Sequence, residues 1–111
     1  LSDYLNSSRH NSIELIQYLV ENDYTFNARE VANQLDSSSI EDCQKFWIIF
    51  ENSRLDGMQM ADIDRYLAFD LDGSILRAIF ENARFRCQNA CRQAGRPALM
   101  EVYDELFAQG Q

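Results

Sequence analysis

The sequence predicts an all-α protein, a compact orthogonal bundle of about six helices that forms a single domain. Only one Pro and four Gly occur in the 111 residues, whereas an all-β fold needs a turn about every eight to twelve residues. Apolar residues instead recur three and four positions apart, which is the spacing of one face of an α-helix. Hydrophobic residues make up 46% of the chain, enough to bury an ordinary core without disulfides or metal ions.

The first predicted helix begins at a capping box. Asn11 is followed three residues later by Glu14, the pattern in which each side chain caps the backbone N–H of the other residue. Residues 1–10 precede this signal, are largely polar and include His10, the one histidine of the chain. We therefore expect a flexible N-terminal segment over residues 1–10 and a single helical domain over residues 11–111.

Two further helices follow in the first half of the chain. Asn27 and Glu30 form a second capping box, which opens a short helix that ends near residue 35. The serines at 37–39 supply the cap of a third helix. Apolar residues lie nearly all round the second half of this third helix, so we expect it to be central and Trp47 to be buried.

Three helices are predicted in the second half of the chain. The fourth covers residues 60–67. Gly73 then interrupts the pattern, and the fifth helix, over about residues 74–94, is the longest. Gly95 is expected just after its end, where a left-handed residue commonly terminates a helix. Pro97 suits the first turn of the sixth helix.

Charge is distributed unevenly along the chain. The formal net charge is −8, which disfavours nucleic acid and anionic membranes as partners. Residues 77–96 nevertheless hold five Arg and one Glu, a net charge of +4. Nine of the ten basic residues are Arg, the side chain best suited to partly buried ion pairs and interfaces. The sequence therefore predicts a basic patch on an otherwise acidic protein.

The cysteines indicate a reducing environment. Cys43, Cys87 and Cys91 are three in number, so they cannot all pair with one another. Cys87 and Cys91 lie four residues apart on the apolar face of the predicted fifth helix, where cysteine is usually a core residue. We therefore expect no metal site, no cofactor and an intracellular, cytoplasmic location. No apolar run approaches the roughly 18 residues that span a bilayer.

One string resembles a catalytic motif. Residues 69–76, FDLDGSIL, resemble the first motif of the haloacid-dehalogenase-like phosphatases, which implies that Asp70 would be a nucleophile and Asp72 a general acid. That chemistry needs Asp70 at the end of a buried parallel strand, but the preceding residues have helical spacing. Only 41 residues follow Asp70, too few for the rest of an α/β domain. We therefore expect a loop in which Asp72 caps the next helix, and no enzymatic activity.

Residues 27–50 have the pattern of a helix-turn-helix. When the residues are counted from Ala32, the positions that this motif buries fall on Asp42 and Lys45. If the turn holds one extra residue, the same buried positions fall on Cys43 and Phe46. The residues left to face a DNA groove are largely acidic or neutral, although phosphate contacts need Lys or Arg. A helix-turn-helix transcription regulator is therefore the alternative function.

The predicted fifth helix carries the candidate functional surface. Its polar side chains form a strip beside the apolar stripe at about 100° per residue, and Phe85 lies outside both. Arg and aromatic side chains are enriched at the energetic centres of interfaces. The candidate interaction residues are Arg77, Arg84, Phe85, Gln88, Arg92 and Arg96.

The expected function is that of a non-enzymatic protein-interaction or regulatory module, of adaptor-like or chaperone-like type. Its partner would be another protein or a second copy of the chain. The acidic remainder of the sequence could supply the complementary surface for a dimer.

Overall fold

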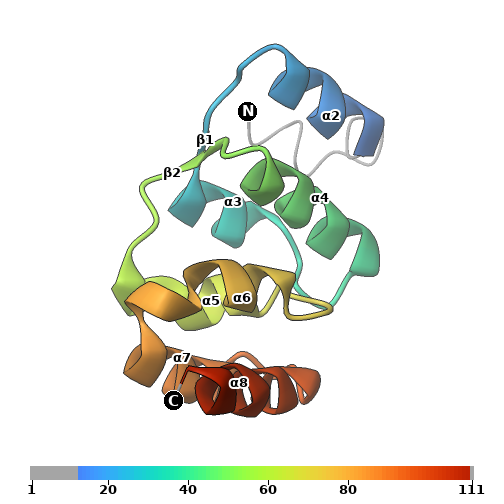
Figure 1. Ribbon diagram of the computed structural model, residues 1–111. Coiled ribbons are helices and arrows are strands. Elements are labelled where there is room, and N and C mark those ends of the chain that lie inside the picture. The colour runs from blue at the N-terminus through green and yellow to red at the C-terminus, as the bar shows by residue number, and fades with distance from the viewer. Residues whose placement is uncertain (1–12, 111) are drawn as a thin grey trace. The chain divides into compact units, whose positions relative to one another are not determined.

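Helices dominate the part of the chain that the computed structural model describes, residues 13–110. Seven α-helices, two short 3-10 helices and one pair of two-residue strands make up the regular structure of this part (Figure 1). The predicted all-α bundle is thereby confirmed. The predicted N-terminal segment, residues 1–10, and the capping residue Asn11 lie outside the described residues. The chain divides into two compact units, Leu1–Met58 and Gln59–Gln111, and the grouping of residues 11–111 into one domain stays a prediction.

The described part of the first unit holds three helices and a short parallel strand pair. Its elements are α2 (Ile13–Glu21), β1 (Phe26–Asn27), α3 (Ala28–Gln34), α4 (Ile40–Glu51) and β2 (Leu55–Asp56). Strand β1 pairs with β2, with Phe26 opposite Leu55, and α2 packs against α4. The buried apolar residues of this unit are Ile16, Val20, Phe26, Ala28, Val31, Leu35, Cys43, Phe46 and Ile49.

The predicted caps of α3 and α4 are confirmed. Asn27 Oδ1 accepts a hydrogen bond from the backbone N–H of Glu30 at 3.1 Å. Ser39 Oγ accepts one from the backbone N–H of Asp42 at 3.3 Å. Each cap satisfies a donor that has no partner within its helix, so these two side chains fix where the helices begin.

The buried side chains of α4 cover an arc of about 160° around the helix axis. They include Phe46 and Ile49, which are fully buried. Trp47 lies at the edge of this arc and is only partly buried, with its ring centroid 6.0 Å from that of Phe50. The prediction of a buried Trp47 is therefore wrong, because Phe46 and Ile49 occupy the core-facing positions around it.

The described part of the second unit holds four α-helices and two 3-10 turns. Its elements are η1 (Met60–Asp62), α5 (Ile63–Leu67), α6 (Ser74–Ile79), η2 (Phe80–Asn82), α7 (Arg84–Gln93) and α8 (Ala98–Gln109). Helix α7 packs against both α5 and α8, and α6 packs against α8. Gly95 has a φ of 74°, which confirms it as the left-handed residue after α7.

The predicted fifth helix over residues 74–94 is wrong as a continuous element. It is divided into α6, the 3-10 turn η2 and α7, and Ala83 at the junction has non-helical angles, φ −151° and ψ 40°. Buried Phe80 lies edge-on to the ring of Tyr103, with centroids 5.5 Å apart. The Tyr103 hydroxyl donates to the backbone carbonyl of Arg84 at 2.8 Å. Helix α8 thus contacts the chain on both sides of the break.

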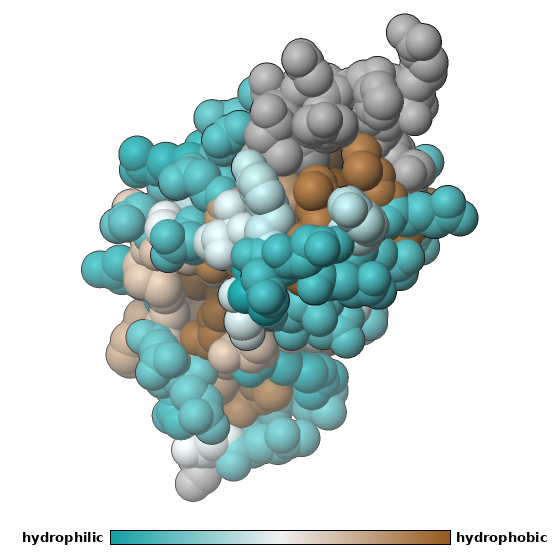
Figure 2. Space-filling view, turned by 90° about the horizontal axis from the view of Figure 1, so that it is seen from above, coloured by the Kyte–Doolittle hydropathy of each residue, from teal (hydrophilic) through white to brown (hydrophobic). Residues whose placement is uncertain are grey.

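The visible surface is mainly hydrophilic. Figure 2 shows one face of the molecule, on which hydrophobic residues appear in separate patches between hydrophilic ones. The large hydrophobic residues that are exposed within residues 13–110 are Tyr18, Tyr24, Ile40, Leu71 and Phe85. Phe85 is the most exposed of them, at 84%.

Candidate functional site

Helix α7 presents two polar flanks separated by an aromatic side chain. Its buried face is formed by Cys87, Ala90 and Cys91. Phe85 projects from the opposite side, because it lies about 180° from the middle of that face. Arg84, Gln88 and Arg92 lie on one flank of Phe85 and are exposed. We call Arg84, Phe85, Gln88 and Arg92 the α7 ridge.

Two of the predicted interaction residues lie away from the α7 ridge. Arg77 belongs to α6, and its Nη2 lies 3.9 Å from Glu105 Oε2 of α8. Arg96 lies in the loop after α7, where its Nε donates to the backbone carbonyl of Ala68 at 2.7 Å. The structure therefore brings four of the six predicted residues together and gives the other two local contacts of their own.

Arg84 is the most constrained member of the α7 ridge. Its guanidinium carbon lies 5.5 Å from the ring centroid of Phe80, within the range of a cation–π interaction. Arg84 and Arg77 both line a hollow of about 210 Å³. The guanidinium charge of Arg84 is thus held beside an aromatic ring, which limits the conformations that this side chain adopts.

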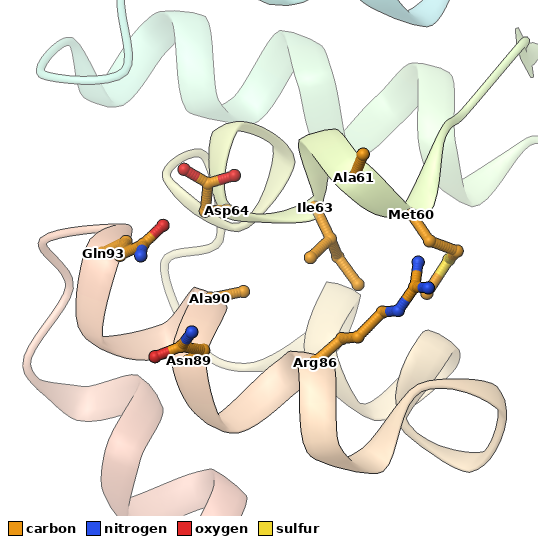
Figure 3. Close-up of a pocket in the computed structure, with 8 residues that line it drawn as sticks. All are labelled: Met60, Ala61, Ile63, Asp64, Arg86, Asn89, Ala90 and Gln93. Atoms are coloured by element: carbon orange, nitrogen blue, oxygen red, sulfur yellow. The ribbon is translucent and has the colours of Figure 1, made fainter.

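A second hollow lies on the other flank of α7. It measures about 300 Å³ and lies between η1 and α5 on one side and α7 on the other (Figure 3). Its lining residues are Met60, Ala61, Ile63, Asp64, Arg86, Asn89, Ala90 and Gln93. We call this hollow the α5–α7 groove. Arg86, Asn89 and Gln93 were missed in the sequence, because only the packing of α5 against α7 shows that their flank borders a concavity.

The cysteine side chains have the properties of core residues. Burial raises the pKa of the Cys87 thiol to about 11. Burial, followed by the effect of neighbouring Cys87, raises the pKa of the Cys91 thiol to about 12. Cys43 Sγ lies 3.3 Å from the backbone carbonyl oxygen of Ser37, to which it donates. Within residues 13–110, no cluster of three or more His, Cys, Asp or Glu side chains could hold a metal ion.

We expect the thiols to be unreactive in the folded protein, since the thiolate is the nucleophile and raised pKa values suppress it. At neutral pH, alkylation of Cys87 and Cys91 should be slower by about 100-fold or more than in the unfolded chain. Mass spectrometry after timed iodoacetamide treatment, with and without urea, measures this ratio.

A chelator or a reductant should leave the melting temperature unchanged, and a fall of several degrees with chelator would contradict the assignment of these residues to the core.

The phosphatase-like string folds as a tight loop. Its first carboxylate, Asp70, is 1% exposed. Oδ1 accepts from the backbone N–H of Gly73, and Oδ2 accepts from that of Leu76, each at 2.9 Å. Burial raises the pKa of this carboxyl group above its usual value. Asp70 follows a helix rather than a strand, and both of its oxygens hold the loop that starts α6.

The cap of α6 differs in detail from the prediction. Asp72 Oδ1 accepts from the backbone N–H of Ser74 at 3.0 Å, but the residue directly before the helix is Gly73, with φ 84°. A Cβ atom at Gly73 would lie 2.8 Å from Val102 Cγ1. Glycine is therefore required here both by its left-handed backbone and by the approach of α8.

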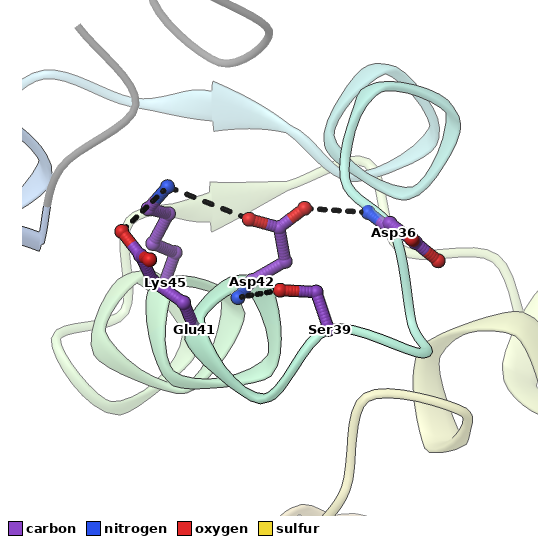
Figure 4. Close-up of polar contacts among 5 residues, drawn as sticks. All are labelled: Asp36, Ser39, Glu41, Asp42 and Lys45. Atoms are coloured by element: carbon purple, nitrogen blue, oxygen red, sulfur yellow. Dashed lines mark hydrogen bonds and ion pairs between the residues drawn. The ribbon is translucent and has the colours of Figure 1, made fainter. Parts of the chain in front are cut away.

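The pattern in residues 27–50 forms a helix pair, α3 and α4, with a buried charge cluster. Lys45, the one lysine of the chain, has a fully buried side chain with its Nζ 3.4 Å from Asp42 Oδ1 and 3.5 Å from Glu41 Oε1 (Figure 4). Asp42 Oδ2 accepts from the backbone N–H of Asp36 at 2.8 Å. The Lys45 ammonium is thus engaged inside the protein. The exposed residues of α4 include Glu41, Gln44 and Glu51, which do not favour contact with phosphate.

The comparisons with known proteins give no family for this chain. No helix within residues 13–110 is both long and apolar enough to cross a membrane. No family description, no curated protein and no solved structure matches the sequence or the fold.

Proposed function

We propose that this protein is a non-enzymatic interaction module, of adaptor-like or regulatory type, which binds a protein partner through the α7 ridge. The observation that carries the proposal is the 84% exposure of Phe85. An aromatic side chain has a large apolar area, and covering that area with a partner removes it from water, which favours binding. Phe85 is flanked in sequence by Arg84 and Arg86, and both Phe and Arg are enriched at interfaces relative to the rest of a protein surface.

Charge indicates the chemistry of the partner. Helix α7 contains Arg84, Arg86 and Arg92 and no acidic residue, so it should attract an acidic surface. The chain itself is acidic, with a net charge of −8, and a second copy meets that requirement. Self-association through α7 is therefore one form of the proposal, and a different acidic protein is the other. A cytoplasmic location belongs to the same proposal.

The alternative is a helix-turn-helix transcription regulator that uses residues 27–50. It has less support, because Lys45 is buried against Asp42 and Glu41. A DNA-binding assay on the whole protein tests it directly. Binding that weakens steeply as salt increases would favour the alternative over the α7 ridge.

The α7 ridge predicts that stability and association respond differently to substitution. Arg84→Glu together with Arg92→Glu should cost less than about 1 kcal/mol of unfolding free energy per site, because both side chains are exposed. The same pair of changes, or Phe85→Ala, should weaken association by about tenfold or more, since like charges would then face an acidic partner. Thermal unfolding measures stability. Sedimentation measures self-association, and affinity capture compares the proteins retained by each variant.

Tyr18→Ala is the matched control, because Tyr18 is also an exposed aromatic residue, at 61%, but lies on α2. The α7 ridge is supported if Phe85→Ala abolishes self-association or the capture of a partner protein while Tyr18→Ala retains it. Unchanged association in the Phe85→Ala variant, with folding intact, would return α7 to the role of a solvated helix face.

A further inference from the structure

We propose that the α5–α7 groove binds an extended peptide segment in which an acidic residue and a basic residue lie three positions apart. The proposal deepens the proposed function, because it names the kind of segment that a partner would insert beside the α7 ridge. The groove has both a size and a set of polar groups that such a segment requires. Its volume of about 300 Å³ is at the lower end of the range for ligand sites, about 300–1,000 Å³.

One wall of the groove is a regular row of polar side chains from α7. Arg86, Asn89 and Gln93 are separated by three and four residues, so they lie within an arc of about 60° on one flank of the helix. All three are exposed. No hydrogen bond or ion pair of their side chains is found within residues 13–110, so their donors and acceptors are open to a ligand.

The floor of the groove is apolar. Ile63 of α5 and Ala90 of α7 are nearly fully buried and point toward one another in the middle of Figure 3. An apolar side chain of the ligand that lies over these two residues would be removed from contact with water. The floor therefore favours a segment with an apolar residue between its charged ends.

The two ends of the groove have opposite charge. Figure 3 shows Arg86 with Met60 at one end and Asp64 with Gln93 at the other. A carboxylate suits the Arg86 guanidinium, which can donate two parallel hydrogen bonds. An ammonium group suits the Asp64 carboxylate. The groove thus prescribes which charge of the ligand lies at each end.

The spacing of the ends fixes the length of the segment. From Arg86 to Gln93 the α7 axis rises by about 10 Å, at about 1.5 Å per residue. A polyproline-type segment rises about 3.1 Å per residue and has three residues per turn, so residues three apart lie about 9 Å apart on the same side. Such a segment has no internal hydrogen bonds, and the primary amides of Asn89 and Gln93 can both donate to and accept from its backbone.

The test uses the whole protein and the peptide acetyl-Gly-Glu-Pro-Leu-Lys-Gly-amide, with the dibasic peptide acetyl-Gly-Lys-Pro-Leu-Lys-Gly-amide as the comparison. In ¹⁵N-labelled protein, the side-chain amide signals of Asn89 and Gln93 should shift saturably with the first peptide, with a dissociation constant of about 0.1–1 mM. The dibasic peptide should bind about tenfold more weakly, since in either chain direction it places an ammonium group against Arg86.

Charge reversal of the groove makes the test specific. The variant Arg86→Glu leaves acidic groups at both ends of the groove and should exchange the preference, so that the dibasic peptide binds more tightly by about tenfold. Arg29→Glu is the matched control, because it makes the same charge change at an exposed residue of α3, outside both the groove and the α7 ridge, and it should leave the preference for the first peptide intact. Dispersed amide spectra of each variant establish that it is folded.

The groove and the α7 ridge can fail independently. Equal binding of the two peptides, or shifts that do not involve Asn89 and Gln93, would overturn the groove while leaving the Phe85 test unaffected. Peptide preference that follows the charge reversal would support the groove even if Phe85→Ala has no effect on partner capture, in which case the ridge alone is wrong.

Discussion

Replacing Lys45 by Met should lower the free energy of unfolding by about 3–5 kcal/mol, since breaking a buried ion pair from one side leaves the other charge uncompensated. The Lys45 side chain is fully buried, and its Nζ lies 3.4 Å from Asp42 Oδ1. Asp42 is only 7% exposed, so water does little to replace the lost ammonium group. Met has a similar length and retains the apolar contacts of the side chain, which isolates the effect of charge.

A second substitution should recover part of this loss. Asp42→Asn removes the unpaired carboxylate charge but retains an oxygen that can accept from the Asp36 backbone N–H, a bond of 2.8 Å in the wild type. The double variant Lys45→Met with Asp42→Asn should therefore be more stable than Lys45→Met alone, by about 1–3 kcal/mol.

Urea unfolding of the four proteins in this cycle gives the coupling free energy between the two side chains. Glu41→Gln is the control, because the Glu41 side chain is 57% exposed and its loss should cost less than about 1 kcal/mol. A cost below about 1 kcal/mol for Lys45→Met would show that the pair contributes little, and the buried position would then need another explanation.

Local signals predicted the start of α3 and α4 because each is set by neighbouring residues. The side-chain oxygen of Asn27 reaches the N–H of Glu30, and that of Ser39 reaches the N–H of Asp42, three residues later in each case. Such contacts depend only on sequence separation. The all-α class was predictable for the same reason, since helical periodicity is a local property.

The two alignments of residues 27–50 with a helix-turn-helix pattern predict different buried residues in α4. The structure buries both sets. Asp42 and Lys45 are buried, and so are Cys43 and Phe46. Each alignment with the helix-turn-helix pattern buries one set of positions, whereas the buried arc of α4 is about 160° wide and includes both sets. Burial of a charged pair could not be inferred from spacing alone, because it depends on what packs around the helix.

The division of the predicted fifth helix was hidden by its own regular pattern. Phe80 and Cys87 are both buried, and seven residues correspond to nearly two full turns, about 700°. The periodicity therefore continues through the break at Ala83 as if the helix were unbroken. Helix α6 packs against α8, whereas α7 packs against both α5 and α8. These tertiary contacts, which also form the α5–α7 groove, are not encoded in the spacing of apolar residues.

Replacing Asp70 by Ala should lower the free energy of unfolding by about 2–5 kcal/mol. The carboxylate accepts from the backbone N–H groups of Gly73 and Leu76, both at 2.9 Å, and is 1% exposed. Each donor left unpaired away from water costs about 1–3 kcal/mol. Asp70→Asn should cost less than Asp70→Ala, because an amide still offers one acceptor to the loop. Asp72→Ala is the control, since Asp72 is exposed, and should cost about 1 kcal/mol.

The cost of Asp70→Ala should also depend on pH, in a direction fixed by the pKa of the carboxyl group. Burial raises this pKa above its usual value of 3.8, so between these two pKa values the folded protein binds the proton that the unfolded chain has released. Wild-type stability relative to the variant should therefore increase as pH falls from 7 toward 4. Urea unfolding of both proteins at pH 7, 5 and 4 measures this difference. A cost that shrinks over this range would mean that the Gly73 and Leu76 hydrogen bonds outweigh burial, and that Asp70 is held in its ionised form.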